Sequence, residues 1–126
     1  MFIKYDCKII GMKKILLLLS IMFSMSANAV EYVNRSNAVV RVMDKAAGKV
    51  QMVTIPVNSE TQVEKLYINV RTCKQTDPFQ AEDYFAFIEI SKIDEGTIFS
   101  GWMSRNEPGD NPLQNADYDV WLVKCE

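Results

Sequence analysis

The chain has 126 residues, of which 48% are hydrophobic and 24% are charged, and its formal net charge is −2 at pH 7. It contains no histidine, which excludes serine–histidine and cysteine–histidine catalysis and any zinc site with histidine ligands. The acidic balance argues against nucleic-acid binding, because that function needs a clustered basic surface.

The N-terminal segment has the three parts of a secretory signal peptide. Met12 begins a short basic stretch, residues 15–23 are apolar except for one serine, and small residues end at Ala29. This apolar run is shorter than the roughly 20 residues of a membrane-spanning helix, so we predict cleavage rather than a lasting membrane anchor. We therefore expect residues 1–29 to be a signal peptide, with Met12 as an alternative start, and residues 30–126 to be one domain.

Export changes both the charge and the expected chemistry of the chain. Residues 30–126 hold ten basic and fifteen acidic residues, a net charge of −5, and no polybasic segment that would bind anionic lipid. The predicted location is the periplasm, with secretion as the alternative. Two cysteines remain, Cys73 and Cys125, and in an oxidising compartment two cysteines usually pair. The alternative is a pair of buried free thiols.

The first half of the predicted domain reads as strands. Residues 37–43 and 50–57 are rich in β-branched residues and flank a turn that contains Gly48, which predicts a hairpin. Pro56 cannot donate to a sheet ladder, so the second strand should lie at an edge or end there. A polar connector follows, with room for one helical turn over 59–65.

The alternation of Leu66, Ile68 and Val70 then predicts a half-buried strand that ends at Cys73. Residues 74–83 read as an exposed loop.

The second half repeats this pattern. Residues 84–90 are apolar on both faces except at Glu89, which indicates a central strand, and residues 97–103 return to form a second hairpin. Gly101 within that run suggests a bulge or a close backbone approach. A long loop, 104–116, precedes the last strand, 117–125. About six short strands without a helical period predict an all-β fold, a small antiparallel sandwich or barrel.

Two strings in the domain are distinctive: F-S-G-W-M, ending at Met103, and Y-D-V-W, ending at Trp121. Together with the segments 38–41, 68–73, 86–90, 98–103 and 118–125, they resemble a known bacterial family, DUF2155, whose members are small exported proteins of unknown function. The resemblance covers about residues 37–126. Ser104 departs from the aromatic residue that the resemblance leads us to expect there, and only Pro78 remains of a proline-rich segment after the first cysteine. The resemblance implies export and this fold, and no activity.

Three carboxylates are candidates for chemistry. Asp117 and Asp119 lie two residues apart on a strand, as in a paired-carboxylate or calcium site, with Asp110 and Asn111 as further oxygen donors. The competing interpretation is a solvated start of the strand. Glu89 is either an acid with a raised pKa or one half of a structural ion pair with Arg71 or Arg41.

The two tryptophans are candidates for ligand contact. We expect both tryptophans to lie in the core, and for Trp121 the reason is that it shares strand parity with Cys125. The alternative is an aromatic platform for a ligand beside the 108–112 loop, with Trp102 at its centre.

The function predicted from the sequence is a non-enzymatic, disulfide-linked binding or structural module of the cell envelope. No cofactor and no metal are expected, and the partner is an unknown envelope protein or polymer. The expected interaction surface comprises Trp102, Ser104, Asp110, Asn111, Asp117 and Asp119. The alternative is a carbohydrate-active hydrolase or carbohydrate-binding module that uses Asp117, Asp119, Glu89 and Trp102.

Overall fold

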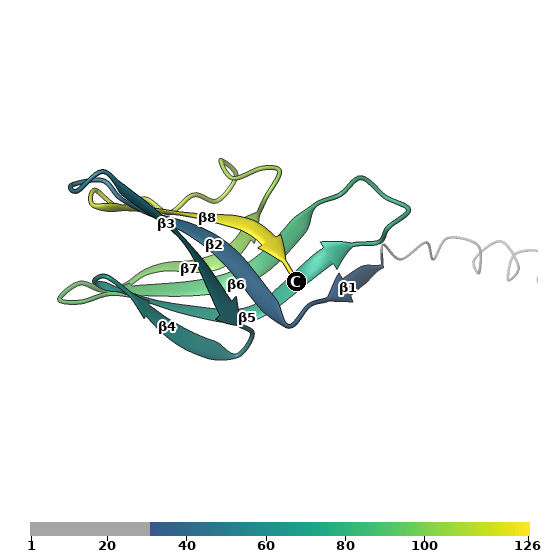
Figure 1. The fold of residues 1–126 in the computed structure, drawn as a ribbon, viewed down its shortest axis with the longest axis horizontal. Coiled ribbons are helices and arrows are strands. Elements are labelled where there is room, and N and C mark those ends of the chain that lie inside the picture. Colours follow the sequence, from purple (N-terminus) through teal and green to yellow (C-terminus); the bar gives the residue numbers. More distant parts are fainter. Residues whose placement is uncertain (1–30) are drawn as a thin grey trace, which may run out of the picture. The chain divides into compact units, whose positions relative to one another are not determined.

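Alternation of apolar and polar side chains along the chain produces strands throughout the computed structural model, which describes residues 31–126 (Figure 1). The predicted signal peptide lies outside the described residues. No helix in the described part of the chain has the length and hydropathy to cross a membrane. The strands are β1 (Tyr32–Asn34), β2 (Asn37–Asp44), β3 (Lys49–Pro56), β4 (Ser59–Val63), β5 (Leu66–Thr76), β6 (Tyr84–Lys92), β7 (Gly96–Ser104) and β8 (Tyr118–Cys125).

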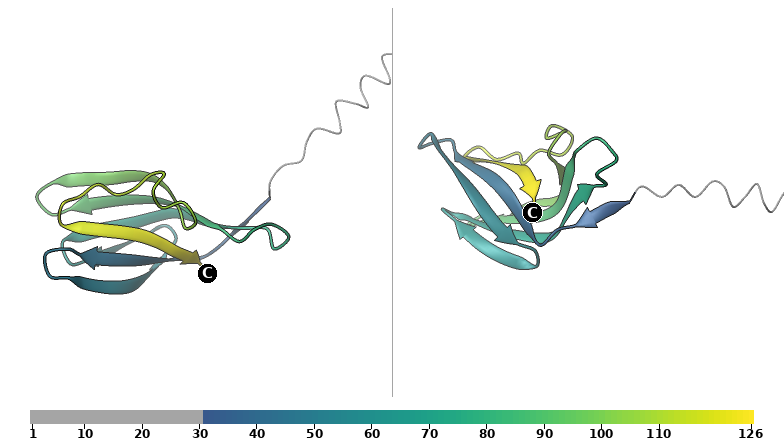
Figure 2. Two further views of the ribbon diagram at one scale, coloured as in Figure 1. Left: turned by 90° about the horizontal axis from the view of Figure 1, so that it is seen from above. Right: turned by 45° about the vertical axis from the view of Figure 1, so that its right-hand side comes forward.

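The strands form two antiparallel sheets that face each other. In sheet A the order is β1-β5-β6-β7, and β4 pairs with the other half of the long strand β5. Sheet B has the order β3-β2-β8. Figures 1 and 2 show sheet B as one layer and sheet A as the other, with the chain crossing between them three times. The predicted all-β antiparallel sandwich is confirmed.

Two strands were missing from the sequence prediction. The polar connector with room for a helical turn is instead β4, which buries Val63, leaves Ser59 and Thr61 half-buried and exposes Glu60 and Gln62. β1 is short and all three of its residues are exposed, so it leaves no periodic signal in the sequence. β5 continues past Cys73 to Thr76, because pairing with β1 extends it beyond the core.

The predicted hairpins are confirmed in detail. β2 and β3 pair through a turn in which Gly48 has a φ of +64°, and β3 ends at Pro56 on the edge of sheet B. β6 is central in sheet A, and its hairpin with β7 turns through Asp94 and Gly96, both with positive φ.

Between the sheets lies a single apolar core. β2, β5, β6 and β8 supply most of its members, which alternate along each strand except where a bulge interrupts β5 and β8. The largest fully buried side chains are Ile55, Leu66, Ile68, Ile88, Ile90, Val40, Val42, Val70 and Cys73.

A β-bulge in β5 decides where the first cysteine points. Val70 pairs with Ile88 and Thr72 pairs with Phe87, so Arg71 has no partner on β6 and the alternation shifts by one residue. Cys73 therefore faces the core, although it has the opposite parity to Val70.

A second bulge in β8 does the same for the other cysteine. Val40 pairs with Leu122 and Val39 with Lys124, which leaves Val123 as the extra residue. Cys125 thus turns inward and forms a disulfide with Cys73, their Cα atoms 5.6 Å apart. The bond joins sheet A to sheet B, in agreement with the pairing predicted from the sequence.

Candidate functional site

The carboxylates that suggested acid–base chemistry are held in separate ion pairs. Glu89 lies on the outer face of sheet A and pairs with Arg71, oxygen to nitrogen 3.2 Å. Asp119 lies on the outer face of sheet B, where it pairs with Lys45 at 3.2 Å. Since the whole sandwich separates these two faces, the structure does not bring Glu89 and Asp119 together.

Asp117 belongs to a third group at the end of the sandwich that holds the tight turns. Its carboxylate contacts the ammonium of Lys92, which is only 8% exposed and also lies 3.0 Å from Glu95. The hydrogen bond and charge of Lys92 lower the pKa of Asp117, and the hydrogen bonds that Lys92 donates to both carboxylates raise the pKa of Lys92. This group ties the β6–β7 turn to the start of β8. Within residues 31–126, no group of three His, Cys, Asp or Glu side chains is placed to hold a metal ion.

Neither tryptophan lies in the core, which corrects the sequence expectation. Trp121 is half-buried on the outer face of sheet B, because the bulge at Val123 breaks the parity that linked it to Cys125. The guanidinium of Arg41 lies 4.7 Å from the centre of its ring. Trp102 is 45% exposed on the outer face of sheet A, so the two rings do not form one platform.

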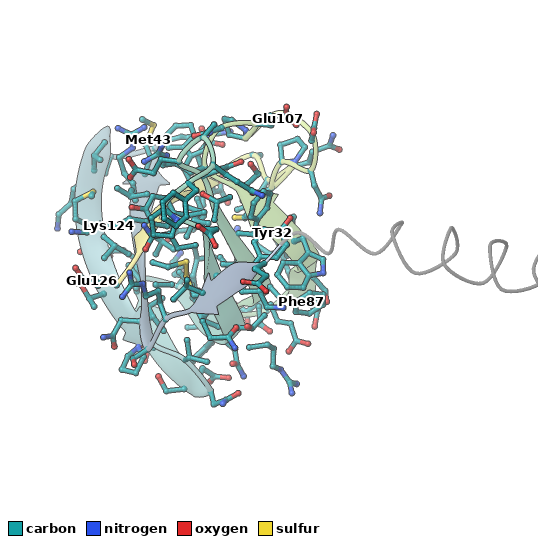
Figure 3. The ribbon with its side chains drawn as sticks, turned by 90° about the vertical axis from the view of Figure 1, so that its right-hand side faces the viewer. Tyr32, Met43, Phe87, Glu107, Lys124 and Glu126 are labelled. Atoms are coloured by element: carbon teal, nitrogen blue, oxygen red, sulfur yellow. A yellow bond between two sulfur atoms is a disulfide. The ribbon has the colours of Figure 1, made fainter. Side chains whose placement is uncertain are left out.

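Trp102 belongs to a cluster that we call the aromatic face, formed on sheet A by Tyr32, Lys74, Phe85, Phe87 and Trp102. Phe87 and Trp102 are cross-strand partners and pack edge to face, ring centres 5.5 Å apart. Tyr32 and Phe85 make a second such pair at 5.6 Å. Figure 3 shows Tyr32 and Phe87 on one side of the domain, and Lys124 and Met43 on the other.

A cavity of about 240 Å³ opens between the two aromatic pairs. It is lined by Tyr32, Lys74, Phe85 and Trp102, and the Lys74 ammonium lies 5.7 Å from the Trp102 ring centre. Aromatic rings form most of the lining of this cavity, and Lys74 adds a positive charge to it. The arrangement suits an apolar or planar group carrying a polar or negative substituent.

The long loop between β7 and β8 closes the open side of the sandwich. Leu113 enters the core, where it is 6% exposed. The side-chain amide of Asn111 donates to the carbonyl of Trp102 at 3.1 Å and lies directly over Gly101. Gly101 itself pairs regularly with Ile88, so the expected bulge is absent there and the close approach is made by the Asn111 side chain.

Asp83 fixes the beginning of this loop. Its carboxylate accepts hydrogen bonds from the Ser104 hydroxyl at 3.1 Å and from the Asn106 backbone N–H at 3.1 Å. Arg105 lies over the Tyr84 ring, 4.9 Å from its centre, and pairs with Glu82. Ser104 thus serves as a loop anchor in this chain.

The predicted interaction surface is therefore divided by the fold. Trp102 lies in the aromatic face, Ser104 and Asn111 fasten the loop, Asp110 is exposed on it, and Asp117 and Asp119 lie in ion pairs elsewhere.

Sequence reasoning missed four members of the aromatic face: Tyr32, Lys74, Phe85 and Phe87. The available signal was the spacing of Phe85 and Phe87, which puts two aromatic rings on the solvent-facing parity of a central strand.

Comparison with known proteins gives one relationship. No curated protein and no solved structure matches the chain. A family model described as "Uncharacterized protein conserved in bacteria (DUF2155)" matches residues 38–125, from the second residue of β2 to the end of β8. The chain belongs to the DUF2155 family of bacterial proteins.

Proposed function

We propose that the protein is a non-enzymatic, exported module that binds another component of the bacterial cell envelope through its aromatic face. The observation that carries the proposal is the exposure of Tyr32 and Trp102, 44% and 45%, on either side of one cavity. Large aromatic rings supply most of the binding energy in many interfaces, and they are costly to leave in water without a partner.

The end of sheet A that carries this face holds a further apolar group. Phe79, at the tip of the loop between β5 and β6, is 98% exposed. Its backbone N–H bonds to the Asp77 carboxylate at 2.9 Å, so the loop presents the ring on a defined turn. An exposed ring held on a defined turn, at the same end of sheet A as the aromatic cavity, favours an interaction surface over a merely solvated one.

Export rests on two features: the signal-peptide pattern that ends at Ala29 and the disulfide between Cys73 and Cys125. Both predict a periplasmic protein whose N-terminal residue is Val30. Intact mass of the protein from a periplasmic fraction measures both features at once. A full-length, reduced chain in the cytoplasm would contradict export.

Site-specific photo-crosslinking in living cells tests the binding surface. A photo-reactive phenylalanine analogue replaces Trp102 in one variant and Met52 in a matched control; Met52 is 56% exposed, on the outer face of sheet B. We expect a discrete crosslinked product from position 102, identifiable by mass spectrometry, and none from position 52. If position 102 gives no crosslinked product, or if both positions give equal products, the aromatic face is not the binding surface.

A carbohydrate-binding module is the second candidate, because an exposed tryptophan ring with a neighbouring cation also suits a sugar. In that case the purified protein should co-sediment with insoluble envelope polysaccharide, and Trp102→Ala should abolish the retention. The separate ion pairs of Glu89, Asp117 and Asp119 give no support to a two-carboxylate hydrolase.

A further inference from the structure

The exposed aromatic rings of the described domain gather at one end of sheet A. Within residues 31–126 the exposed aromatic side chains are Tyr32, Phe79 and Trp102. Tyr32 lies on β1, which pairs with the last residues of β5, Phe79 lies in the loop that follows β5, and Trp102 lies near the end of β7 (Figure 1). The other exposed large apolar side chains are aliphatic, and only Val33 lies at this end; the rest are Val50, Met52 and Ile93.

Phe79 projects from this end, whereas the other two rings border a hollow. Tyr32 and Trp102 line the aromatic cavity, and Phe79 does not belong to its lining. A folded protein partner would need a pocket for the Phe79 ring and a projection for the cavity, whereas the acyl chains of a fluid lipid layer adapt to both. Tyrosine and tryptophan rings also favour the boundary between lipid and water, because they combine an apolar body with one polar group.

The charges at this end have no excess of one positive sign that would select an anionic lipid. Arg105 is paired with Glu82, and the mature chain as a whole is negative. Binding to anionic headgroups needs a cluster of unpaired basic residues, so the mixture of charges here matches a zwitterionic headgroup instead. The charged side chains of this end are Arg35, Lys74, Arg105, Asp77, Glu82 and Asp83.

Under the proposed export, the connectivity of the chain brings this end to a membrane. The apolar run of the predicted signal peptide ends at residue 23 and β1 begins at Tyr32, so only the eight residues 24–31 connect them. Even when fully extended, this connection spans at most about 30 Å. While the apolar run is in the membrane, β1 and the aromatic face are therefore kept close to the membrane surface.

We propose that the aromatic face and Phe79 dock on the zwitterionic phospholipid surface of the membrane that the chain has crossed. Phe79 enters the acyl chains, and Tyr32 and Trp102 lie at the level of the headgroups. The contact is reversible, because a few rings insert and no attraction between net charges adds to them. This inference rests on the proposed function and names the envelope component that the aromatic face contacts.

The test uses the exported, oxidised protein and vesicles of phosphatidylcholine with brominated acyl chains, which quench the emission of a tryptophan that contacts them. Since the chain has two tryptophans, Trp121→Phe leaves only Trp102 as a reporter and Trp102→Phe leaves only Trp121. We expect the vesicles to quench the emission of Trp102 and to leave that of Trp121 unchanged, because Trp121 lies on the outer face of sheet B. Equal quenching of the two reporters, or none of Trp102, would overturn the proposal.

The decisive variant is Phe79→Ser, which removes a ring that contributes nothing to the core. It should weaken co-sedimentation with phosphatidylcholine vesicles about tenfold. Met52→Ser is the matched control, since Met52 is exposed on sheet B, and it should change binding by less than about twofold. Equal effects of the two substitutions would contradict insertion at this end.

The charge of the lipid gives an independent measurement. Vesicles of phosphatidylglycerol should bind the protein more weakly than phosphatidylcholine vesicles, and added salt should leave binding to phosphatidylcholine unchanged. Tighter binding to phosphatidylglycerol that salt removes would show attraction by charge, and the assignment of a zwitterionic surface would be wrong.

Photo-crosslinking at position 102 separates this inference from the proposed function. A phospholipid adduct at that position supports both. A crosslinked protein or polysaccharide, together with no binding to vesicles, would keep the aromatic face as the binding surface and overturn the lipid assignment.

Discussion

Lys92 is the one charged side chain buried within residues 31–126. Lys92 has the same parity as Ile88 and Ile90 on β6. Extending the predicted strand by two residues would therefore have placed the Lys92 side chain on the core side, at the end of the core. A buried ammonium needs carboxylate partners, and the fold supplies Asp117 and Glu95. The burial of Lys92 thus explains why Asp117 has a structural role. The sequence prediction missed this ion pair because it ended the strand two residues before Lys92.

The Lys92–Asp117 pair predicts a specific dependence of stability on pH. Because the folded state lowers the pKa of Asp117, its contribution is present above the unfolded value of about 4 and is lost as the pH falls through the lower folded-state pKa. The raised pKa of Lys92 gives a contribution that is full below about 10.5 and is lost as the pH rises through the folded-state value. Urea unfolding midpoints from pH 2 to 11 measure both limbs.

Asp117→Asn should lower the unfolding midpoint at neutral pH and flatten the acid limb. Glu60→Gln is the control, since Glu60 on β4 makes no ion pair in the described domain. An unchanged acid limb in the Asp117 variant would show that the pair does not contribute to stability.

Gly101 gives a second prediction at single-residue resolution. A Cβ at this position would lie 2.7 Å from the Asn111 amide nitrogen, so Gly101→Ala must displace the side chain that fastens the loop to Trp102. We expect the free energy of unfolding to fall by about 1 kcal/mol. Gly109→Ala, in the same loop with nothing within 4 Å, should change it by less than about 0.5 kcal/mol. Equal effects of the two substitutions in chemical denaturation would contradict this account.

At the scale of elements, the two bulges matter most. Cys73 in β5 stands three residues after the core residue Val70, and Cys125 in β8 stands three residues after Leu122. Uninterrupted alternation would turn both cysteines to solvent. On regular strands the two sulfurs would lie on opposite outer faces of the sandwich. Because each strand contains an extra residue, Arg71 or Val123, the disulfide depends on a bulge that accommodates it.

Deleting Arg71 should remove the bulge and leave the cysteine two positions after Val70, so that regular alternation still turns it inward and the disulfide forms. Deleting both Arg71 and Thr72 should instead place the cysteine directly after Val70 and turn it to solvent. The expected result for the double deletion is a chain with free thiols, whose mass does not change on reduction and which reacts with a thiol reagent; the single deletion is the control. A native disulfide in the double deletion would show that strand parity does not set the cysteine's direction.

The elements also show what the sequence could and could not predict. Six strands, both hairpins, the edge position of β3 and the central position of β6 follow from alternation, turn residues and one proline. The missed strands, β1 and β4, are edge strands that bury little and so lack an apolar pattern. The direction of Trp121 was mispredicted because a bulge changes parity without leaving a mark in composition. The aromatic face combines β1, β5, β6 and β7, and only pairing register brings these together.

At the scale of the whole molecule, the disulfide adds a covalent link between two sheets that also share an apolar core and the Lys92–Asp117 ion pair. The bond joins residues 52 positions apart, and a closed loop of that size contributes about 4 kcal/mol by restricting the unfolded chain. That is a large part of the roughly 5–15 kcal/mol that stabilises a typical domain.

Replacing both cysteines by alanine should lower the free energy of unfolding by about 3–4 kcal/mol. Urea denaturation of the double variant and of the oxidised protein gives the difference, and the reduced protein provides an independent comparison. A loss below about 1 kcal/mol would mean that the core alone holds the sheets together.

The order of the strands has a consequence for a polypeptide threaded across a membrane from its N-terminus. Apart from β1, sheet A is built from strands that are neighbours in sequence, so the β4–β7 meander can assemble while later residues are still in transit. β2 and β3 have to wait for β8, and Cys73 emerges with no other thiol in residues 31–126 until Cys125 follows. Under the proposed export, oxidation within one molecule would therefore follow only once Cys125 has crossed, and a chain stalled before that point would carry a single free thiol at Cys73.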